Sequence, residues 1–483
     1  MPDSASRVGS DAEYDAIAKR HQALALEQIG ASLERLEWSP DRLAAHREAR
    51  LREILRHAVQ NSKWHAERLR GIDLERISES DLEQIPPMTK SDLMDNWDAI
   101  ATVPGLTLAR CEDHLDALDA PRYLDDHFHV VASGGSSGKR GVFAYDWVGW
   151  ATYYASYVRW LARRVVRGAM PPPAEMVSGF VGAYALTHPT VALTRTFSPS
   201  TGIASSFPVT LPLDEIVSGL NALQPDMLAG YASALALLAH EAEAGRLSIA
   251  PVAIVTTSEP LLPEMAESIE AAFGVRPINI YGTADAGIVG VGCGEASGMH
   301  LMDDELIIEA VDALGRRVTP DERAAKLYVT VLYQHALPMI RYELSDEIEW
   351  IPEPCPCGSS FRRIRDIQGR LDDTFVYATD ATETGNGRDT ARIAVHPHVF
   401  RSPLARVREI AEYQVTQTTR GAALLVVSVG AFDRDDLAAS IEADLRRLGL
   451  SQPIVSIESV DTISRLGVGK LKRFVPLPQG SAA

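Results

Sequence analysis

The segment at residues 133–139 reads Ser-Gly-Gly-Ser-Ser-Gly-Lys and has the composition of a phosphate-binding loop. Glycine allows the close approach and positive φ with which backbone N–H groups surround phosphate oxygens, and Lys139 adds a positive charge. The segment is not a Walker A motif, because Ser133 stands where that motif requires glycine and Arg140 where it requires Ser or Thr. Taken alone, a flexible Gly/Ser connection between two strands explains the same residues.

Two later segments place polar residues where strands are expected to end. Residues 257–260 read Thr-Ser-Glu-Pro, and residues 280–285 read Ile-Tyr-Gly-Thr-Ala-Asp. The carboxyl ends of parallel strands border the ligand crevice of an open sheet, so both segments are expected at one pocket. Further along, Asp346 follows Arg-Tyr-Glu-Leu-Ser, and Lys470 lies in a glycine-flanked segment. Each has a plainer interpretation: Asp346 as a turn cap, Lys470 as part of a basic tail, and Glu259 as a carboxylate at a helix N-terminus.

Three cysteines and one histidine have a spacing that suggests a metal site. Cys355 and Cys357 form a C-x-C pair, and Cys293 lies seven positions before His300 in the sequence. Three thiolates and one imidazole make the closed tetrahedral shell of a structural zinc. The competing interpretation is a set of reduced thiols with a surface histidine, since zinc ligand pairs more often have two to four intervening residues. Cys111 lies far away in the sequence and is not expected to take part.

The elements that must position these residues follow from hydrophobic periodicity. Residues 12–70 are predicted to be helical, and Thr89 is predicted to cap a short helix after Pro86-Pro87. Strands and helices alternate over residues 129–290, which predicts an α/β fold with a mainly parallel sheet covered by helices. Short strands after residue 290 predict a smaller antiparallel subdomain, and the tail from about residue 371 mixes strands with a helix.

The predicted helix at residues 150–166 is rich in aromatic and basic side chains. Its aromatic residues are interpreted as packing rather than as pocket walls: Tyr153, Tyr154, Tyr157 and Trp160. Its arginines are interpreted as a solvated helix face rather than as phosphate ligands: Arg159, Arg163, Arg164 and Arg167.

Length and composition describe an ordinary globular protein of more than one domain. The chain has 483 residues, of which 46% are hydrophobic and 23% charged, and no apolar run has the length of a membrane span. The formal net charge of −18 argues against binding to nucleic acid or to anionic membrane surfaces. The first residues contain no apolar signal segment, so the cytoplasm is the expected location.

Taken in order, these motifs resemble the adenylate-forming superfamily, and specifically its phenylacetate–CoA ligase-like branch. The resemblance covers about residues 50–475. Residues 85–93 resemble that branch's LP-x-T-K-x-DL pattern, and residues 338–342 and the Cys-Pro-Cys-Gly at 355–358 followed by Gly-Arg-Leu-Asp-Asp at 369–373 also match it. The Cys/His cluster recurs in relatives, which favours the zinc interpretation.

The resemblance implies a role for each matching position. The β- and γ-phosphates of ATP would be held by Ser133, Gly134, Gly135, Ser136, Ser137, Gly138 and Lys139. The adenine pocket would be lined by Ser258, Glu259 and Pro260, with Tyr281 and Gly282 stacking on the base or the acyl group. Asp346 would bind the ribose hydroxyls, Arg370 the ribose or a phosphate, and Asp372 would be the hinge of the small domain. Lys470 would neutralise charge where the substrate carboxylate attacks the α-phosphate.

Some positions depart from the family pattern. Ala284-Asp285 replaces the usual Ser/Thr-Glu after Tyr-Gly, so Asp285 would hold magnesium and Thr283 would substitute for the missing hydroxyl. His188 lies where relatives place a residue near the acyl carboxylate. The polar segment at 379–390 replaces a tighter loop that helps to form the thioester-stage site.

The implied function is ATP-dependent activation of an aromatic or small carboxylic acid, followed by transfer to CoA. Two alternatives remain: transfer to a carrier-protein thiol or an amine, and a degenerate nucleotide-binding protein that has lost catalysis. The implied cofactors are ATP, Mg²⁺, CoA and structural Zn²⁺, and relatives suggest a homodimer. The expected domains are residues 1–370 for adenylation, with a zinc-bearing subdomain at 291–365, and a small mobile domain at 371–483 that carries Lys470.

Overall fold

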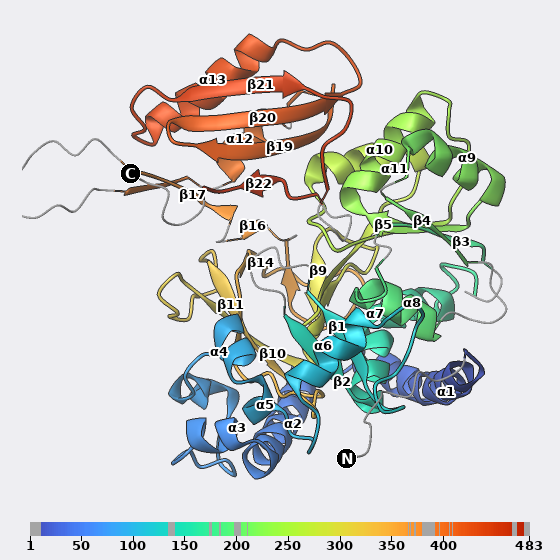
Figure 1. Ribbon diagram of the computed structural model, residues 1–483, viewed down its shortest axis with the longest axis vertical. Helices are drawn as coiled ribbons and strands as arrows, with labels where there is room; N and C mark the ends of the chain where they lie inside the picture. Colours follow the sequence, from blue (N-terminus) through green and yellow to red (C-terminus); the bar gives the residue numbers. More distant parts are fainter. Residues whose placement is uncertain are drawn as a thin grey trace, which may run out of the picture.

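The computed structural model arranges the chain as an α/β body with a smaller C-terminal part above it (Figure 1). The structure describes residues 11–133, 141–172, 176–182, 185–197, 204–209, 211–365, 367, 369–370, 373–378, 392–395, 397–404, 406–407, 409–465 and 471–477. None of the helices in these ranges combines the length and the apolar character of a membrane-spanning segment.

The N-terminal region is helical, as the periodicity predicts. Ser39 caps α2 by accepting from the Arg42 N–H, and Thr89 forms a capping box with Asp92 at the start of α4. The helices and the one 3₁₀ turn of this region are α1 (Asp11–Arg35), α2 (Pro40–Asn61), α3 (Lys63–Arg68), η1 (Glu79–Gln84), α4 (Lys90–Asp95), α5 (Trp97–Ile100) and α6 (Leu108–Asp116).

A nine-stranded mixed sheet forms the centre of the larger body. The strands run in the order β14-β15-β9-β8-β7-β6-β5-β3-β4, and the five from β4 to β7 are parallel. The predicted parallel α/β sheet is therefore confirmed, with an antiparallel extension. Its strands are β3 (Ser178–Gly182), β4 (Ala204–Pro208), β5 (Met227–Tyr231), β6 (Ala253–Thr257), β7 (Ile278–Thr283), β8 (Gly287–Val291), β9 (Met299–Leu301), β14 (Trp350–Ile351) and β15 (Arg363–Ile364).

Helices cover the sheet and complete its crossovers. α10 and α11 pack with β5 and β6 around a buried apolar cluster that includes Leu235, Leu238 and Ile269. The helices that follow the predicted alternation are α7 (Trp147–Val166), α8 (Pro189–Phe197), α9 (Leu213–Leu223), α10 (Ala232–Glu243) and α11 (Pro263–Phe273).

The prediction of a solvated arginine face on α7 is wrong for two of its four arginines. Arg159 is fully buried and bonds to Asp304 at 2.7 and 2.8 Å, and Arg163 is buried against Glu37 at 2.6 Å. Helix α1 packs along α7 and supplies Arg35, which also pairs with Asp304. These charges lie inside the protein because a second helix and a distant carboxylate cover them, and neither neighbour is visible from the sequence around α7.

Small antiparallel units border the sheet. The hairpin β1 (His129–Ala132) and β2 (Val142–Tyr145) presents Ser133 directly after its first strand. A three-stranded sheet is formed by β10 (Leu306–Val311), β11 (Lys326–Val331) and β12 (Tyr342–Leu344), and β13 (Asp346–Glu347) pairs with β16 (Gly369–Arg370). Met88 bridges to Tyr342, which ties the start of α4 to β12.

The C-terminal elements form the orange and red body at the top of Figure 1. Their buried apolar residues, from Phe375 to Phe474, form a cluster of their own around a four-stranded sheet of order β21-β20-β19-β22. The elements are β17 (Phe375–Ala378), β18 (Arg392–Val395), α12 (His398–Leu404), β19 (Ile410–Thr418), β20 (Gly421–Ser428), α13 (Arg434–Arg447), β21 (Ile454–Ser459) and β22 (Phe474–Val475). Helix α10 of the larger body contacts β19.

Candidate functional site

A cavity of about 490 Å³ opens where parallel strands β6 and β7 end. Its walls come from both strand ends, the start of α4, the end of β1, helices α7 and α8, strands β12 and β13, and the C-terminal segment 471–474. This is the volume of a pocket for a small-molecule ligand, and it lies at the position where open α/β sheets bind ligands.

The structure gathers ten of the predicted site residues at this one cavity. They are Ser133, His188, Ser258, Glu259, Pro260, Tyr281, Gly282, Thr283, Asp285 and Asp346. Backbone pairing joins Arg370 to Asp346, so Arg370 lies in the strand beside the cavity. The predicted residues Gly134, Gly135, Ser136, Ser137, Gly138, Lys139, Asp372 and Lys470 lie outside the described residues, as does the segment 379–390. The roles of all these residues stay predictions.

At the start of the predicted phosphate loop, Ser133 is held from two sides. Its hydroxyl oxygen accepts from the Gly141 N–H at 2.8 Å and from the Lys90 ammonium at 3.0 Å. The backbone N–H of Ser133 donates to the Gly141 carbonyl at 2.9 Å. Lys90 therefore brings a positive charge to the place where an anionic group would meet this loop.

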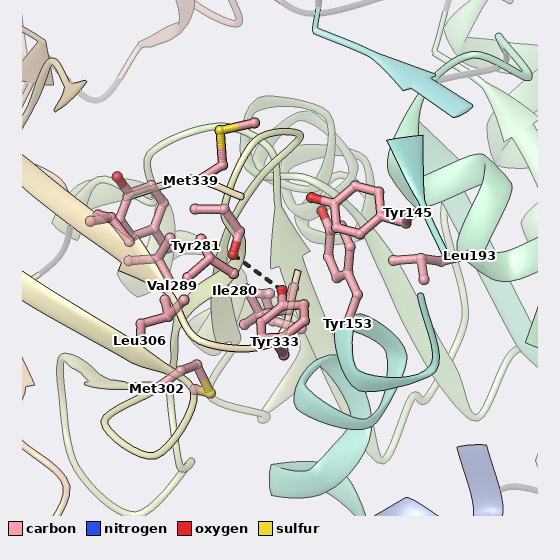
Figure 2. Close-up of a cluster of buried hydrophobic side chains, with 14 of the residues drawn as sticks. Tyr145, Tyr153, Leu193, Ile280, Tyr281, Val289, Met302, Leu306, Tyr333 and Met339 are labelled. Atoms are coloured by element: carbon pink, nitrogen blue, oxygen red, sulfur yellow. Dashed lines mark hydrogen bonds between the residues drawn. The ribbon is translucent and has the colours of Figure 1, made fainter. Parts of the chain in front are cut away.

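The turn that carries Asp285 is fixed by phenol hydroxyls. Tyr153 donates to the carbonyl of Thr283 and Tyr145 to the carbonyl of Ala284, both at 2.9 Å. Figure 2 shows Tyr145 and Tyr153 lying next to each other in the buried cluster; their ring centroids are 5.5 Å apart. Burial raises the pKa of both phenols, so they remain protonated and can donate.

Two further tyrosines lie beside the same turn. Tyr333 donates to the carbonyl of Ala286 at 3.2 Å, drawn as a dashed line in Figure 2, and its hydroxyl leaves no room for a Cβ at Gly287, where φ is +75°. Tyr342 lies close to Asp285, and burial followed by the nearby Asp285 charge raises the pKa of Tyr342. Asp285 Oδ1 accepts from the Ala286 N–H at 3.0 Å. The Asp285 carboxylate is thus presented to the cavity in a defined orientation.

The second acidic group of the cavity is also oriented by a phenol. Tyr281 donates to Asp346 Oδ2 at 2.8 Å, and Asp346 is 4% exposed. The bond therefore helps to set the orientation of the Asp346 carboxylate in the cavity wall, and a carboxylate is a suitable acceptor for hydroxyl groups.

Glu259, which was predicted to line an adenine pocket, also forms hydrogen bonds within the protein. Its carboxylate accepts from the Ser233 N–H at 3.1 Å and from the Leu471 N–H at 3.0 Å. Ser233 lies in the first turn of α10, and Leu471 belongs to the C-terminal part of the chain. Glu259 therefore joins two separate elements at the rim of the cavity.

The cavity wall includes two aromatic residues that were predicted to pack in the core and several cations that were not predicted. Tyr153 and Tyr157, interpreted as packing, line the cavity, because one face of α7 turns toward the end of β7. Cations that line the cavity without having been predicted are Lys90, Arg401, Lys472 and Arg473. Lys90 carried a usable signal, since it is the lysine of the branch-like pattern at residues 85–93.

The Cys/His set converges in space although it spans 65 residues of sequence. The ligand atoms of Cys293, His300, Cys355 and Cys357 lie within 4.8 Å of one another, and all four residues are buried. Cys293 and Cys355 have their sulfurs 3.6 Å apart, and Cys357 Sγ lies 3.4 Å from His300 Nε2. The interpretation of His300 as a surface residue is therefore wrong. Cys111 is buried elsewhere and is not part of this group.

In sequence, the chain is similar to phenylacetate-coenzyme A ligases over most of its length. It is 26% identical to the enzyme of that name from Aromatoleum evansii over 462 residues, which cover 90% of this chain and 95% of the relative. It is 25% identical to the Thermus thermophilus enzyme of the same name, with 88% and 87% of the two chains covered. The resemblance indicated by the ordered motifs is confirmed by these relatives. No family model matches the chain.

The fold is that of solved acyl-adenylate-forming CoA ligases. A structure of 2-hydroxyisobutyryl-CoA ligase in the postadenylation state, in complex with 2-HIB-AMP, superposes with a TM-score of 0.67 at 20% identity, with 92% of each chain covered. A structure of the same ligase in complex with 2-HIB-AMP and CoA gives a TM-score of 0.55 at 19% identity, with 91% of each chain covered.

Proposed function

We propose that this chain, a relative of the phenylacetate–coenzyme A ligases, is an ATP-dependent acid–thiol ligase. It activates a small carboxylic acid as an acyl-adenylate with release of pyrophosphate, and then transfers the acyl group to CoA. The observation that carries the proposal is the convergence of ten motif residues at one cavity of about 490 Å³, in a chain related to such ligases over 90% of its length.

The described residues suit the first step chemically. A carboxylate that attacks the α-phosphate brings two anions together, so the site must supply cations and fixed donors where charge accumulates. Lys90, bonded to Ser133, supplies a cation at the start of the phosphate loop. Asp346, oriented by Tyr281, suits the ribose hydroxyls. Lys470, directly before Leu471 in the sequence, is the proposed cation for the attacking carboxylate.

Asp285 is the residue we propose to hold Mg²⁺. Carboxylate oxygens are the ligands that this ion prefers, and Asp285 lines the cavity with Oδ1 held by the Ala286 N–H at 3.0 Å. When bound, the ion would neutralise phosphate charge. Ala284 lacks the hydroxyl that relatives carry, but the Thr283 hydroxyl accepts from the Ala286 N–H at 3.0 Å and is part of the same cavity wall. Thr283 is thus the proposed substitute.

An aromatic acid is the substrate class that the described walls favour. The part of the cavity between α7, α8 and β7 is lined by Tyr153, Tyr157, Leu193 and Ile280, which offer apolar and ring surfaces. Aromatic rings pack on each other in offset or edge-on arrangements that add about 0.5–1.5 kcal/mol to area burial. His188, at the start of α8, is the proposed partner of the substrate carboxylate.

The Cys/His set fits a structural zinc. With Zn–S bonds of about 2.3 Å, tetrahedral sulfurs lie roughly 3.8 Å apart, and the observed Cys293–Cys355 separation is 3.6 Å. His300 Nδ1 bonds to the Phe361 carbonyl at 3.0 Å, which fixes the ring so that Nε2 faces Cys357. Metal analysis of protein purified without chelator should find one zinc per chain. Cys357→Ser should lose the zinc and Cys111→Ser should keep it; less than stoichiometric zinc in the parent refutes the assignment.

We further propose that residues 371–483 are a small mobile domain that turns about Asp372, and that the enzyme works in the cytoplasm. The separate apolar cluster over positions 375–474 supports the first statement. Four free cysteines support a reducing compartment.

The test is pyrophosphate release over a panel of aryl and small carboxylic acids, beginning with phenylacetate, with and without CoA. Acid-dependent release together with a thioester product supports the proposal. Adenylate formation without any thioester would instead point to a carrier-protein thiol or an amine as acceptor. Silence over the whole panel would indicate a chain that has lost catalysis.

A further inference from the structure

Arg465 connects the C-terminal part of the chain to the wall of the cavity. Its guanidinium forms an ion pair with Glu412 of β19 through Nη2. Through Nη1 it donates to Ser233 Oγ at 3.2 Å and lies 4.0 Å from Glu259 Oε1. The side chains are 10% exposed for Arg465, 4% for Glu412 and 5% for Glu259. Removing a cation that is buried between two carboxylates leaves their charge uncompensated, so its loss has a larger effect than the loss of a surface pair.

The partners of Arg465 belong to different parts of the fold. Glu412 lies on β19, in the sheet of the C-terminal part, whereas Ser233 and Glu259 lie on α10 and after β6 in the larger body. Arg465 itself precedes the C-terminal segment 471–474 in sequence. It is therefore bound to its own part of the chain by Glu412, and it meets the larger body at the cavity rim.

Glu259 completes the connection. The same Oε1 that faces Arg465 accepts from the Leu471 N–H at 3.0 Å, while Oε2 accepts from the Ser233 N–H. Leu471 lies directly after the predicted catalytic Lys470, and Leu471, Lys472 and Arg473 all line the cavity. The Glu259 carboxylate thus contacts both Arg465 and Leu471, which lie six positions apart in the sequence.

From these contacts we infer that Arg465 is a positioning residue for the adenylation step, which docks the C-terminal segment 471–474 against the cavity through Glu259 and Ser233. The inference rests on the proposed function, and it assigns to Glu259 a docking role in addition to any contact with adenine. Arg465 is not one of the residues that line the cavity. Arg465 would act by holding the backbone near the predicted Lys470, and with it Lys472 and Arg473, close to the place where the substrate carboxylate attacks the α-phosphate.

The contact is specific to one arrangement of the two parts. If the C-terminal part turns for the second step, the pair Arg465–Glu412 turns as a unit, and the contacts to Ser233 and Glu259 break. Loss of Arg465 should therefore slow adenylation much more than thioester formation from preformed adenylate. A purely structural residue would affect both half-reactions through the amount of folded protein.

The experiment compares both half-reactions in Arg465→Gln, Arg465→Lys and the parent. Adenylation is followed by phenylacetate-dependent exchange of pyrophosphate into ATP, and thioester formation by the reaction of synthetic phenylacetyl-adenylate with CoA. Arg446→Gln is the matched control, because Arg446 pairs at 2.8 Å with Glu442 within α13, where its side chain is 52% exposed. We expect adenylation by Arg465→Gln to fall about tenfold or more, thioester formation to change less than about twofold, and Arg465→Lys to be intermediate.

Ser233→Ala keeps the inference testable if Arg465→Gln does not fold. It removes only the hydroxyl that accepts from Arg465 and keeps the Ser233 N–H that donates to Glu259. It should lower adenylation about two- to fivefold without changing thioester formation. Equal losses in both half-reactions, or no loss of adenylation in either variant, overturn the inference. A parent enzyme without phenylacetate- or other acid-dependent exchange would instead contradict the proposed function.

Discussion

Replacing Tyr145 by phenylalanine tests whether the phenols around the Asp285 turn serve catalysis or only stability. Tyr145 is fully buried, does not line the cavity, and donates to the Ala284 carbonyl at 2.9 Å. Removing this hydroxyl leaves a buried carbonyl without that donor, which should cost about 1–2 kcal/mol of unfolding free energy. Because Ala284 is next to Asp285, we also expect the substitution to displace the Asp285 carboxylate and to lower the affinity of the site for Mg²⁺.

The chain supplies a matched control for this substitution. Tyr377 is also buried and donates to a backbone carbonyl, that of Gly421, at 2.8 Å, but it lies within the C-terminal apolar cluster. Tyr145→Phe and Tyr377→Phe should therefore lose similar amounts of stability in urea unfolding. Only Tyr145→Phe should raise the Mg²⁺ concentration for half-maximal pyrophosphate release, by about three- to tenfold. Equal Mg²⁺ dependence in the two variants would show that the bond to Ala284 does not orient the site.

Three further changes test the site and the core. Lys90→Met should raise the KM for ATP by about tenfold, because it removes the cation bonded to Ser133. The control Lys63→Met, at an exposed position, should leave the KM for ATP unchanged. Tyr281→Phe should raise the KM for ATP by about threefold through loss of its bond to Asp346, and an unchanged value would exclude that positioning role. Burial lowers the pKa of His21 to about 4 and that of His65 to about 3, so both are neutral when folded and take up protons on unfolding. The free energy of unfolding that each neutral histidine contributes is therefore complete well above pH 6.5 and should fall by about 2 kcal/mol by pH 5. Urea unfolding at pH 7 and pH 5 measures this loss of stability, and His65→Gln should make the loss smaller.

The parts of the site that the sequence predicted are those that local rules determine. Glu259 follows β6 and Tyr281 lies in the last part of β7, and the parallel pairing of the two strands brings their ends together. Thr89 was identified as a cap because a capping box lies within four residues of sequence. Each of these predictions uses neighbours in sequence or the regular geometry of a parallel sheet.

The parts that were missed depend on partners far away in sequence. Arg159 was expected in solvent, but it is buried by Asp304, which lies 145 residues later. Lys90 meets Ser133 across 43 residues. A helical period shows which residues share a face, but not which face another element covers, so burial of a charge on α7 cannot be predicted from α7 alone.

Two of the carboxylates that line the cavity show how an acid can be oriented by the protein and still serve a ligand. Asp346 accepts from the Tyr281 phenol at 2.8 Å, and Asp285 Oδ1 accepts from the Ala286 N–H at 3.0 Å, so each acid has a neutral donor among its partners. A paired guanidinium would satisfy an acid through two bonds and compete with any ligand cation or hydroxyl. A phenol fixes one oxygen, adds no charge and leaves lone pairs for a ligand. We therefore expect Asp285 to serve a metal ion and Asp346 the ribose hydroxyls, with Lys90 beside Ser133 as a cation of the same cavity wall.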